Sequence, residues 1–281
     1  MKLARLSDGK RTFWAAVEPE KNTGREIAGT ILDWGAGIAK GNLDLPFTGK
    51  TVQLTGHKYL PPIEPASKIA AVGANYQKHL DELKLARPPQ PVAFLKPYSA
   101  LVGQDEEVRY PPITNQLDHE VELVAVMGAP NLEDRTRPSD SLLGYTVGND
   151  VSARDLQRSP LGGMDLFSAK IHDRTAGLGP WIVTRDEFPK GPIDLAISMK
   201  IDGEVRQDDR TINMIWGVDE LLLYVDDRTS LHTGDIVYTG TPAGVAMATG
   251  RYLNPGETME AIIEKIGSLR NRVGEKPVRR N

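Results

Sequence analysis

The stretch Leu117-Asp118-His119-Glu120-Val121-Glu122-Leu123-Val124-Ala125-Val126 is apolar and β-branched towards its C-terminal end, which predicts a strand. Side chains alternate between the two faces of a strand, so Glu120 and Glu122 are expected on one face. Val124 and Val126 continue that face. Two carboxylates that lead into a buried face need a cation, because an unpaired buried charge is costly. The stretch alone is equally compatible with an edge strand whose polar end reaches water.

The composition is that of a soluble globular protein. The chain has 281 residues, 40% of them hydrophobic and 26% charged, enough for one large domain or a main domain with a small appendage. Its formal net charge of −4 provides no basic surplus for binding nucleic acid or an anionic membrane. We therefore expect neither partner, whereas a local basic pocket for an acidic small molecule is compatible with this balance.

The sequence contains no cysteine, which excludes disulfides, thiolate metal sites and a cysteine nucleophile. Any metal must use oxygen or imidazole ligands, which favours magnesium, manganese or calcium over structural zinc. The stretch from Met1 to Asp8 lacks an apolar signal region, and no run approaches the roughly 18 apolar residues of a membrane span. A cytoplasmic enzyme or binding protein is therefore expected.

The glycine and proline contents predict the fold class. The 27 glycines and 20 prolines favour many short strands, and Asp202-Gly203 is a hairpin signal. Helical patterns are few and irregularly spaced, so a regular βαβ array is disfavoured. We predict an α+β, mainly β fold, with a mixed β-sandwich or β-roll as the main domain. The proline-rich stretch 59–65 predicts the boundary between a small N-terminal domain, 1–62, and the main domain, 66–276.

Three minor features complete the organisation of the chain. Gly35-Ala36-Gly37 lacks a clear strand–loop–helix context, so dinucleotide binding is disfavoured. A short helix is predicted between Glu133 and Leu142. The basic tail from Gly274 to Asn281 is expected to lie outside the packed fold.

A helix is predicted from Tyr76 to Leu85, with Asn75 as its N-cap. His79 and Glu82 are three residues apart and therefore neighbours on this helix. A preceding glycine and the following prolines are compatible with a mobile lid that carries the pair. By spacing alone, an ordinary surface His–Glu pair is the better interpretation.

Several ordered motifs give the chain a resemblance to the fumarylacetoacetate hydrolase family, over roughly Lys68 to Val273. The motifs, in order, are Val72-Gly73-Ala74-Asn75-Tyr76 with His79 and Glu82, Phe94-Leu95-Lys96-Pro97, Asp118-His119-Glu120-Val121-Glu122-Leu123, the stretch from Gly144 to Gln157, Leu178-Gly179-Pro180-Trp181, and Thr239-Gly240-Thr241-Pro242-Ala243-Gly244-Val245. The resemblance implies a β-roll catalytic domain, an active-site divalent metal, usually magnesium, and a homodimer.

The resemblance also implies roles for single residues. The metal ligands would be Glu120, Glu122 and Asp150, three hard oxygen donors of the kind that Mg²⁺ and Ca²⁺ prefer. The catalytic groups would be His79, Glu82 and Lys170. Glu82 would orient the imidazole of His79, and Lys170 would stand beside a developing enolate. Substrate would be contacted by Arg154, Gln157 and Thr241.

The chain departs from the family pattern around Lys170. The family often has Gly-Lys-Ser-Phe-Asp followed by an aromatic residue, whereas this sequence reads Ala169-Lys170-Ile171-His172-Asp173-Arg174-Thr175. His172 and Arg174 are therefore unusual additions. They would either recognise a second acidic or hydroxylated group on the substrate or face solvent.

The leading functional hypothesis is metal-dependent hydrolysis of a carbon–carbon bond in an acylpyruvate or fumarylacetoacetate-type diketo acid. His79, held by Glu82, would activate water, and a metal-bound pyruvate enolate would leave. The alternative is an oxaloacetate decarboxylase, or a tautomerase or isomerase of a 2-oxo diacid, that uses the same enolate site. A metal-binding scaffold with an inactive site would require some of the catalytic residues to be missing, whereas the three carboxylates, the His–Glu pair and Lys170 are all present.

Overall fold

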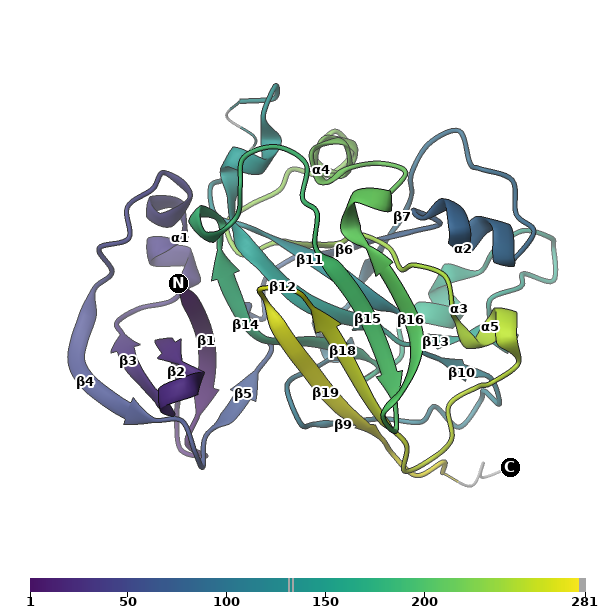
Figure 1. The fold of residues 1–281 in the computed structure, drawn as a ribbon, viewed down its shortest axis with the longest axis horizontal. Coiled ribbons are helices and arrows are strands. Elements are labelled where there is room, and N and C mark those ends of the chain that lie inside the picture. The colour runs from purple at the N-terminus through teal and green to yellow at the C-terminus, as the bar shows by residue number, and fades with distance from the viewer. Residues whose placement is uncertain (131, 133, 278–281) are drawn as a thin grey trace.

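The computed structural model describes residues 1–130, 132 and 134–277 (Figure 1). Within the described residues the strands form a twelve-stranded sheet, a five-stranded sheet and a two-stranded sheet, accompanied by short helices. The α+β, mainly β fold expected from the sequence is confirmed. The tail at 278–281 and residue Glu133 of the expected 133–142 helix lie outside the described residues, and Pro138–Ser141 is a 3-10 turn.

The large sheet extends through the molecule in the order β4-β3-β2-β1-β14-β12-β11-β17-β6-β7, with β5 beside β1 and β8 beside β14. Its strands are β1 (Lys2–Ser7), β2 (Thr12–Glu18), β3 (Thr23–Ile27), β4 (Phe47–Gln53), β5 (Lys58–Leu60), β6 (Ile69–Gly73), β7 (Val92–Lys96), β8 (Leu101–Val102), β11 (Val121–Met127), β12 (Leu142–Asp150), β14 (Ala176–Thr184) and β17 (Ile236–Tyr238).

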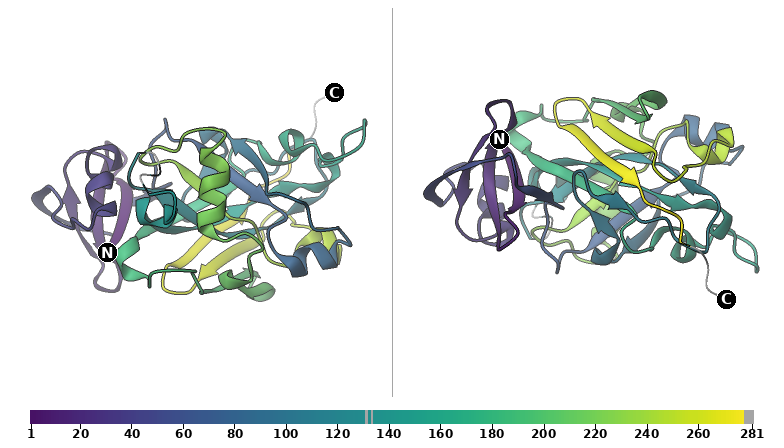
Figure 2. Two further views of the ribbon diagram at one scale, coloured as in Figure 1. Left: turned by 90° about the horizontal axis from the view of Figure 1, so that it is seen from above. Right: turned by 90° about the horizontal axis from the view of Figure 1, so that it is seen from below.

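The five-stranded sheet covers one face of the large sheet (Figure 2). Its order is β16 (Glu204–Arg210), β15 (Ala196–Ile201), β18 (Thr258–Ile263), β19 (Gly267–Val273) and β9 (Glu107–Val108). The core between the sheets includes Leu123 and Val147 from the large sheet and Ile197 and Ala261 from the smaller one. Burial of such apolar surface is the main force that holds the two sheets together.

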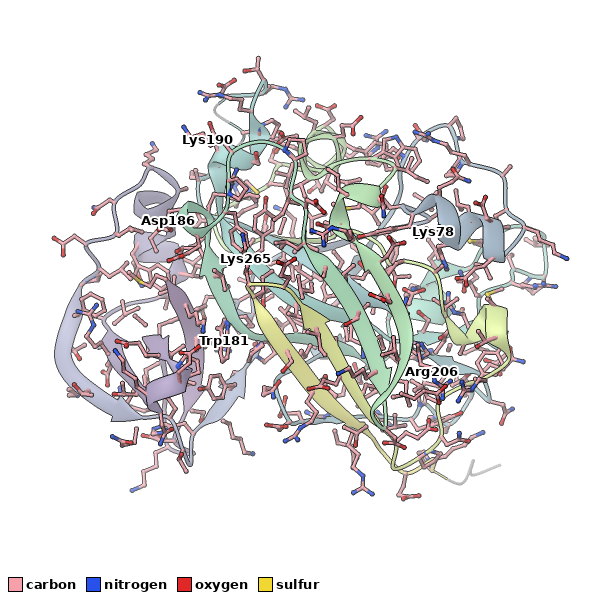
Figure 3. The ribbon with its side chains drawn as sticks, in the orientation of Figure 1. Lys78, Trp181, Asp186, Lys190, Arg206 and Lys265 are labelled. Carbon is pink, nitrogen blue, oxygen red and sulfur yellow. The ribbon has the colours of Figure 1, made fainter. Side chains whose placement is uncertain are left out.

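The first sixty residues continue the large sheet at one end, because β1 pairs with β14 through Lys2↔Val183 and Leu3↔Ile182. Trp181 of β14, labelled in Figure 3, lies at this junction. Its ring packs edge-on against Tyr59 with centroids 6.0 Å apart, and its indole N–H donates to the carbonyl of Ile266 at 2.7 Å. The division into domains 1–62 and 66–276 stays a prediction.

The helices differ in detail from those expected. The helix expected at 76–85 is shorter, and Asn75 does not cap it. The Asn75 amide instead donates to the carbonyls of Trp216 and Thr239, which fastens the start of the helix to two distant segments. The α-helices are α1 (Ile31–Ala39), α2 (Gln77–Glu82), α3 (Leu166–Lys170), α4 (Val218–Asp226) and α5 (Ala246–Thr249), and the 3-10 turns are Pro19–Lys21, Tyr98–Ala100, Pro138–Ser141, Arg154–Leu156, Arg185–Glu187 and Thr211–Asn213.

None of the helices among the described residues has the length and apolarity needed to cross a membrane. The segment 158–175 contains α3, which begins after its N-cap Asp165. The Asp165 side chain accepts from the backbone N–H of Ser168 at 2.8 Å. This helix matters for the site, because its last residue is Lys170.

Candidate active site

The strand expected over Leu117–Val126 is interrupted. β10 (Leu117–Asp118) pairs with β13 (Ser152–Ala153), and β11 begins at Val121, so His119 and Glu120 form a break between them. Glu122 remains on the face of Val124 and Val126, as predicted, because both valines belong to the same core cluster while Val121 and Leu123 belong to the opposite one.

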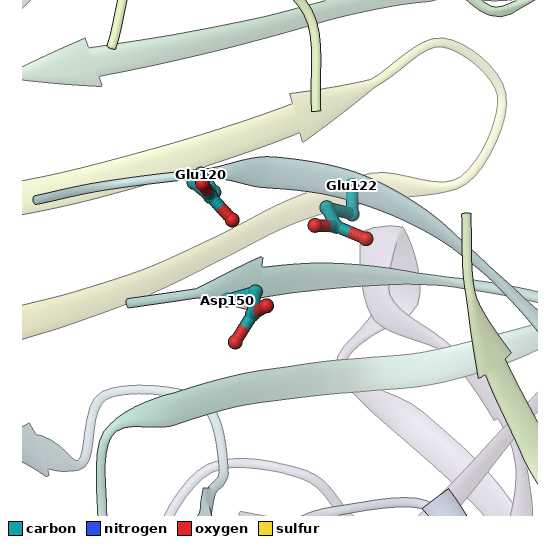
Figure 4. A group of neighbouring side chains, drawn as sticks. All are labelled: Glu120, Glu122 and Asp150. Atoms are coloured by element: carbon teal, nitrogen blue, oxygen red, sulfur yellow. The ribbon is translucent and has the colours of Figure 1, made fainter. Parts of the chain in front are cut away.

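Three carboxylates meet at this break: Glu120, Glu122 and Asp150 (Figure 4). The register between β11 and β12 aligns Val121 with Asn149, and the N–H of Asp150 donates to the carbonyl of Glu120 at 2.9 Å. One oxygen from each carboxylate lies within 4.8 Å of the others, and all three residues are buried. Hard oxygen donors at this spacing can surround one divalent cation.

The carboxylates are electrostatically unequal. Burial, with repulsion from Asp150 and Glu120, raises the pKa of Glu122 well above its usual range. Burial acts the same way on Glu120, but Lys170 and Arg154 outweigh it and hold the pKa of Glu120 below its usual value. In the metal-free protein Glu122 therefore holds a proton more readily than Glu120 does.

Three buried cations surround the cluster. Lys170 Nζ donates to Asp150 Oδ2 at 3.0 Å and also to Glu120. Although burial disfavours its charge, Asp150 and Glu120 raise the pKa of Lys170. Lys96 Nζ donates to Asp150 Oδ1 at 2.6 Å and to the carbonyl of Lys170. Lys96 therefore bonds both the Asp150 carboxylate and the backbone of Lys170.

Arg154 supplies the third cation. Its Nε donates to Asp118 Oδ2 at 2.7 Å, its Nη1 to Gln157 Oε1 at 2.9 Å, and its Nη2 to Glu120. Asp118 also accepts from the backbone N–H of Ala246 at 2.6 Å. Arg154 and Gln157 share a face, as their three-residue spacing predicted.

The charge balance of this network fits a divalent ion and an anionic substrate. Four carboxyl groups face three cationic side chains, so full ionisation leaves one excess negative charge. Protonation of Glu122 removes that excess in the metal-free protein. A divalent ion that displaced this proton would leave one positive charge, which one carboxylate of a bound oxo acid would neutralise. The four carboxyl residues are Asp118, Glu120, Glu122 and Asp150, and the cations are Lys96, Lys170 and Arg154.

The loop 239–245 connects the carboxylates to the His–Glu pair. The N–H of Gly240 donates to Glu122 Oε2 at 2.7 Å, and the N–H of Gly244 donates to Glu82 Oε2 at 2.8 Å. Both glycines have positive φ, +95° and +104°. A Cβ on Gly244 would lie 1.9 Å from the carbonyl oxygen of Arg206, so only glycine fits there. The loop therefore fixes two parts of the site at once.

His79 and Glu82 form the predicted pair on α2. His79 Nδ1 lies 2.8 Å from Glu82 Oε1, and the histidine is buried rather than on the surface. His79 lines a narrow pocket of about 50 Å³ together with Glu120, Arg154 and Lys170. Pockets that bind small molecules commonly measure about 300–1,000 Å³, so this one is too small to admit a substrate without rearrangement. Substrate entry must exchange some contacts between these side chains for contacts to the ligand.

The structure thus brings most of the predicted residues together, and a few lie elsewhere. Thr241 is buried, and its hydroxyl is engaged with the carbonyl of Val121 and the amide of Gln207, at 2.9 and 2.8 Å. Arg174 is exposed and lies beside Glu106, at 3.9 Å. His172 lines a different pocket with Arg109 and Asp173.

Two residues of the network were not among the predicted site residues. Lys96 follows Val92 and Phe94 on one face of β7, and a lysine that ends an otherwise apolar, half-buried face was the available signal. Asp118 stands within the opening stretch, two residues before Glu120. Its role depends on Arg154, which is 36 residues away in the sequence, so periodicity could not reveal it.

We predict that a divalent metal stabilises the protein more strongly as the pH rises. The raised pKa of Glu122 means that the folded, metal-free protein holds a proton that the unfolded chain releases near its usual pKa of 4.5. The free energy of unfolding of the metal-free form therefore falls as the pH rises from the unfolded-state pKa to the raised folded-state pKa. In the metal-bound form the proton is displaced, so this loss does not occur. The increase in Tm with Mg²⁺ should be larger at pH 8 than at pH 6. In Glu122→Gln the increase in Tm with Mg²⁺ should be small at both pH values. If the variant kept the wild-type pH dependence of this increase, Glu122 would not be the group responsible.

Lys96→Met should destabilise the protein by ~3 kcal/mol, because it leaves a buried carboxylate short of a partner. Lys96 and Asp150 have side-chain exposures of 0% and 2%, so solvent offers little compensation. The free energy of unfolding in urea measures the effect. Lys78→Met is the matched control, because Lys78 pairs with Asp209 at 3.5 Å from a side chain that is 67% exposed (Figure 3). The control should lose less than about 1 kcal/mol. Equal losses would show that the Lys96 pair has no special role.

Comparisons with known proteins agree with this geometry. A family model described as fumarylacetoacetate (FAA) hydrolase C-terminal matches residues 68–274. The chain is 36% identical over 222 residues to a 2,4-didehydro-3-deoxy-L-rhamnonate hydrolase of Sphingomonas, covering 78% of this chain and 77% of that protein.

Two solved structures share the fold. The 5-carboxymethyl-2-hydroxymuconate delta-isomerase of Mycobacterium smegmatis superposes with a TM-score of 0.82 at 33% identity, over 98% of this chain and 100% of that one. A fumarylpyruvate hydrolase of Pseudomonas aeruginosa, in complex with Mn²⁺ and pyruvate, gives 0.67 at 32% identity, over 78% and 92%. These relatives are enzymes, and the chain belongs to the fumarylacetoacetate hydrolase family.

Proposed function

We propose that the protein hydrolyses a carbon–carbon bond in an acylpyruvate-type 2,4-dioxo acid, with a divalent metal, magnesium first and manganese or calcium as alternatives. One observation carries the proposal. His79 of the His–Glu pair, Glu120 of the carboxylate cluster and Lys170 line one pocket. Hydrolysis needs both a general base for water and a site that tolerates enolate charge, and this pocket offers the two together.

The carboxylates are the proposed metal ligands. Glu120, Glu122 and Asp150 would hold the ion, which when bound would act as a Lewis acid on the 2-oxo acid oxygens. The manganese and pyruvate in the Pseudomonas fumarylpyruvate hydrolase support this assignment. Arg154 and Gln157 would hold the substrate carboxylate or oxo oxygens, once Arg154 exchanges its contact with Glu120 for one with the substrate. Because Thr241 bonds the backbone, it would act by positioning the loop 239–245 next to the pocket.

The proposed steps balance as a hydrolysis. Glu82 accepts the Nδ1–H of His79, which leaves the Nε2 lone pair free to take a proton from water. The water oxygen bonds to the C4 carbonyl carbon, and the C3–C4 bond then breaks with its electron pair moving to C3. Lys170 offsets the negative charge of the pyruvate enolate that departs. Protonation of C3 gives pyruvate, and the acyl group leaves as a carboxylic acid.

A second candidate is decarboxylation of oxaloacetate, or tautomerisation or isomerisation of a 2-oxo diacid. These reactions form the same enolate and need no water nucleophile. The similarity to the Mycobacterium smegmatis isomerase favours this candidate, and the intact His–Glu pair favours hydrolysis. A homodimer and a cytoplasmic location, expected from the sequence, remain predictions.

The proposal is tested with purified protein, Mg²⁺ and a panel of acylpyruvates. The absorbance of the dioxo acid should fall while pyruvate and the free acid appear in equal amounts. Oxaloacetate should release carbon dioxide more slowly than the best acylpyruvate is cleaved. Failure to cleave any acylpyruvate would overturn the proposal, and rapid carbon dioxide release would favour the second candidate.

The His–Glu pair is tested by substitution. His79→Ala should lower kcat by about 10²- to 10⁴-fold, because the general base is lost. Glu82→Gln should lower it less and shift the pH profile, since the remaining imidazole is less basic. Gln77→Ala on the same helix is the control, because Gln77 is exposed and its side chain donates to Asp81 Oδ1 at 2.8 Å, away from the His–Glu pair. Unchanged turnover in His79→Ala would remove the pair from the mechanism.

A further inference from the structure

The lining of the pocket combines two groups of side chains. Glu120, Arg154, Lys170, Gln157 and His79 are its charged and polar members, which we call the charged end. Leu83, Leu85, Val92, Phe94, Met164 and Leu166 are its apolar members, which we call the apolar end. A substrate that placed its oxo-acid head on the charged groups would leave the apolar side chains to contact its acyl tail.

The fold builds the apolar end from three separate segments. Val92 and Phe94 alternate with Lys96 on β7, so a single strand face carries both the apolar lining and the buried lysine. The Phe94 ring lies 5.6 Å from Lys96 Nζ and 5.9 Å from Lys170 Nζ. The phenyl ring therefore lies within cation–π distance of both ammonium groups.

The other two segments flank the catalytic groups in sequence. Leu83 and Leu85 follow α2, directly after Glu82, and Met164 and Leu166 precede Lys170 around the start of α3. Helices α2 and α3 are drawn on the same side of the molecule in Figure 1. The residues that would contact the acyl tail thus lie next to the catalytic residues on the same elements.

The basic side chains of the pocket already contact carboxylates of the protein. Among the described residues that line it, the basic side chains are Lys170, Arg154 and His79. Lys170 and Arg154 contact Glu120, and His79 contacts Glu82. His172 and Arg174, which the sequence offered for a second acidic group, lie outside this lining. A carboxylate at the far end of a substrate would therefore lose its water without gaining a partner.

We propose that the site selects oxo acids whose far end is uncharged and apolar, that is, monocarboxylic acylpyruvates with an alkyl or aryl acyl group, over dicarboxylic analogues. The inference rests on the proposed function for the orientation of the substrate. It separates this chain from a fumarylpyruvate hydrolase, because fumarylpyruvate carries a carboxylate at both ends. Leu85, Phe94 and Met164 are the residues that determine this specificity.

A pair of ligands with equal chain length tests the inference by binding. The probes are 2-oxohexanoate and 2-oxoadipate, which share the oxo-acid head and six carbons and differ in a terminal methyl or carboxylate. Calorimetric titration of the Mg²⁺-loaded protein should give a Kd at least tenfold lower for 2-oxohexanoate. An equal or lower Kd for 2-oxoadipate would overturn the inference.

Variants at the rim of the apolar end provide the complementary test. Leu85 and Met164 are 48% and 51% exposed, so an arginine at either position can fold with its charge near solvent. Leu85→Arg and Met164→Arg should each shift the Kd ratio at least tenfold towards 2-oxoadipate. Leu95→Arg is the matched control, because Leu95 is 55% exposed on the same strand as Phe94 and lies outside the lining. The control should keep the wild-type ratio. A shift in all three variants would mean that general surface charge decides.

Turnover separates failure of the inference from failure of the proposed function. If acylpyruvates are cleaved and dicarboxylic ones are preferred, the inference is wrong and the proposed reaction stands. If no dioxo acid is cleaved while 2-oxohexanoate still binds more tightly than 2-oxoadipate, the reaction is wrong and the specificity stands.

Discussion

Burial of like charge is the constraint on which the site depends. Glu120, Glu122 and Asp150 converge where β11 and β12 leave the core, and all three are buried. Such a cluster is unstable without cations, so Lys96, Lys170 and Arg154 are drawn into it from three other segments. A divalent ion and an oxo acid would complete this balance. The same electrostatic requirement thus shapes the resting network and the ligands that the site would accept.

The loop 239–245 transmits this organisation to the His–Glu pair. Its two amides reach Glu122 and Glu82, which belong to different elements, and its conformation depends on glycines at positive φ. Asn75 bonds the carbonyl of Thr239 at the start of the loop and thereby fixes the residue that precedes α2. The base and the carboxylates are consequently held by backbone groups, which do not change rotamer when ligands exchange.

Pattern and family resemblance together anticipated much of the site. Glu120 and Glu122 were placed on one face by strand periodicity, and the fold class followed from the turn residues and the scarcity of helices. Lys96 and Asp118 were not found, because their partners Asp150 and Arg154 are distant in the sequence. The cap assigned to Asn75 was wrong because its side-chain oxygen, the atom that would cap α2, accepts from the N–H of Trp216, while its NH2 group donates to the carbonyls of Trp216 and Thr239.

The sequence by itself determined the types of chemistry available: oxygen or imidazole ligands, a His–Glu pair three residues apart, and a strand that brings two carboxylates to one side. These follow from local periods of the backbone and from composition. Only the tertiary structure decided which groups share a pocket. It placed Phe94 beside both buried lysines, and it directed Arg174 and His172 elsewhere. Contacts between distant segments depend on sheet register and loop geometry, which no local pattern specifies.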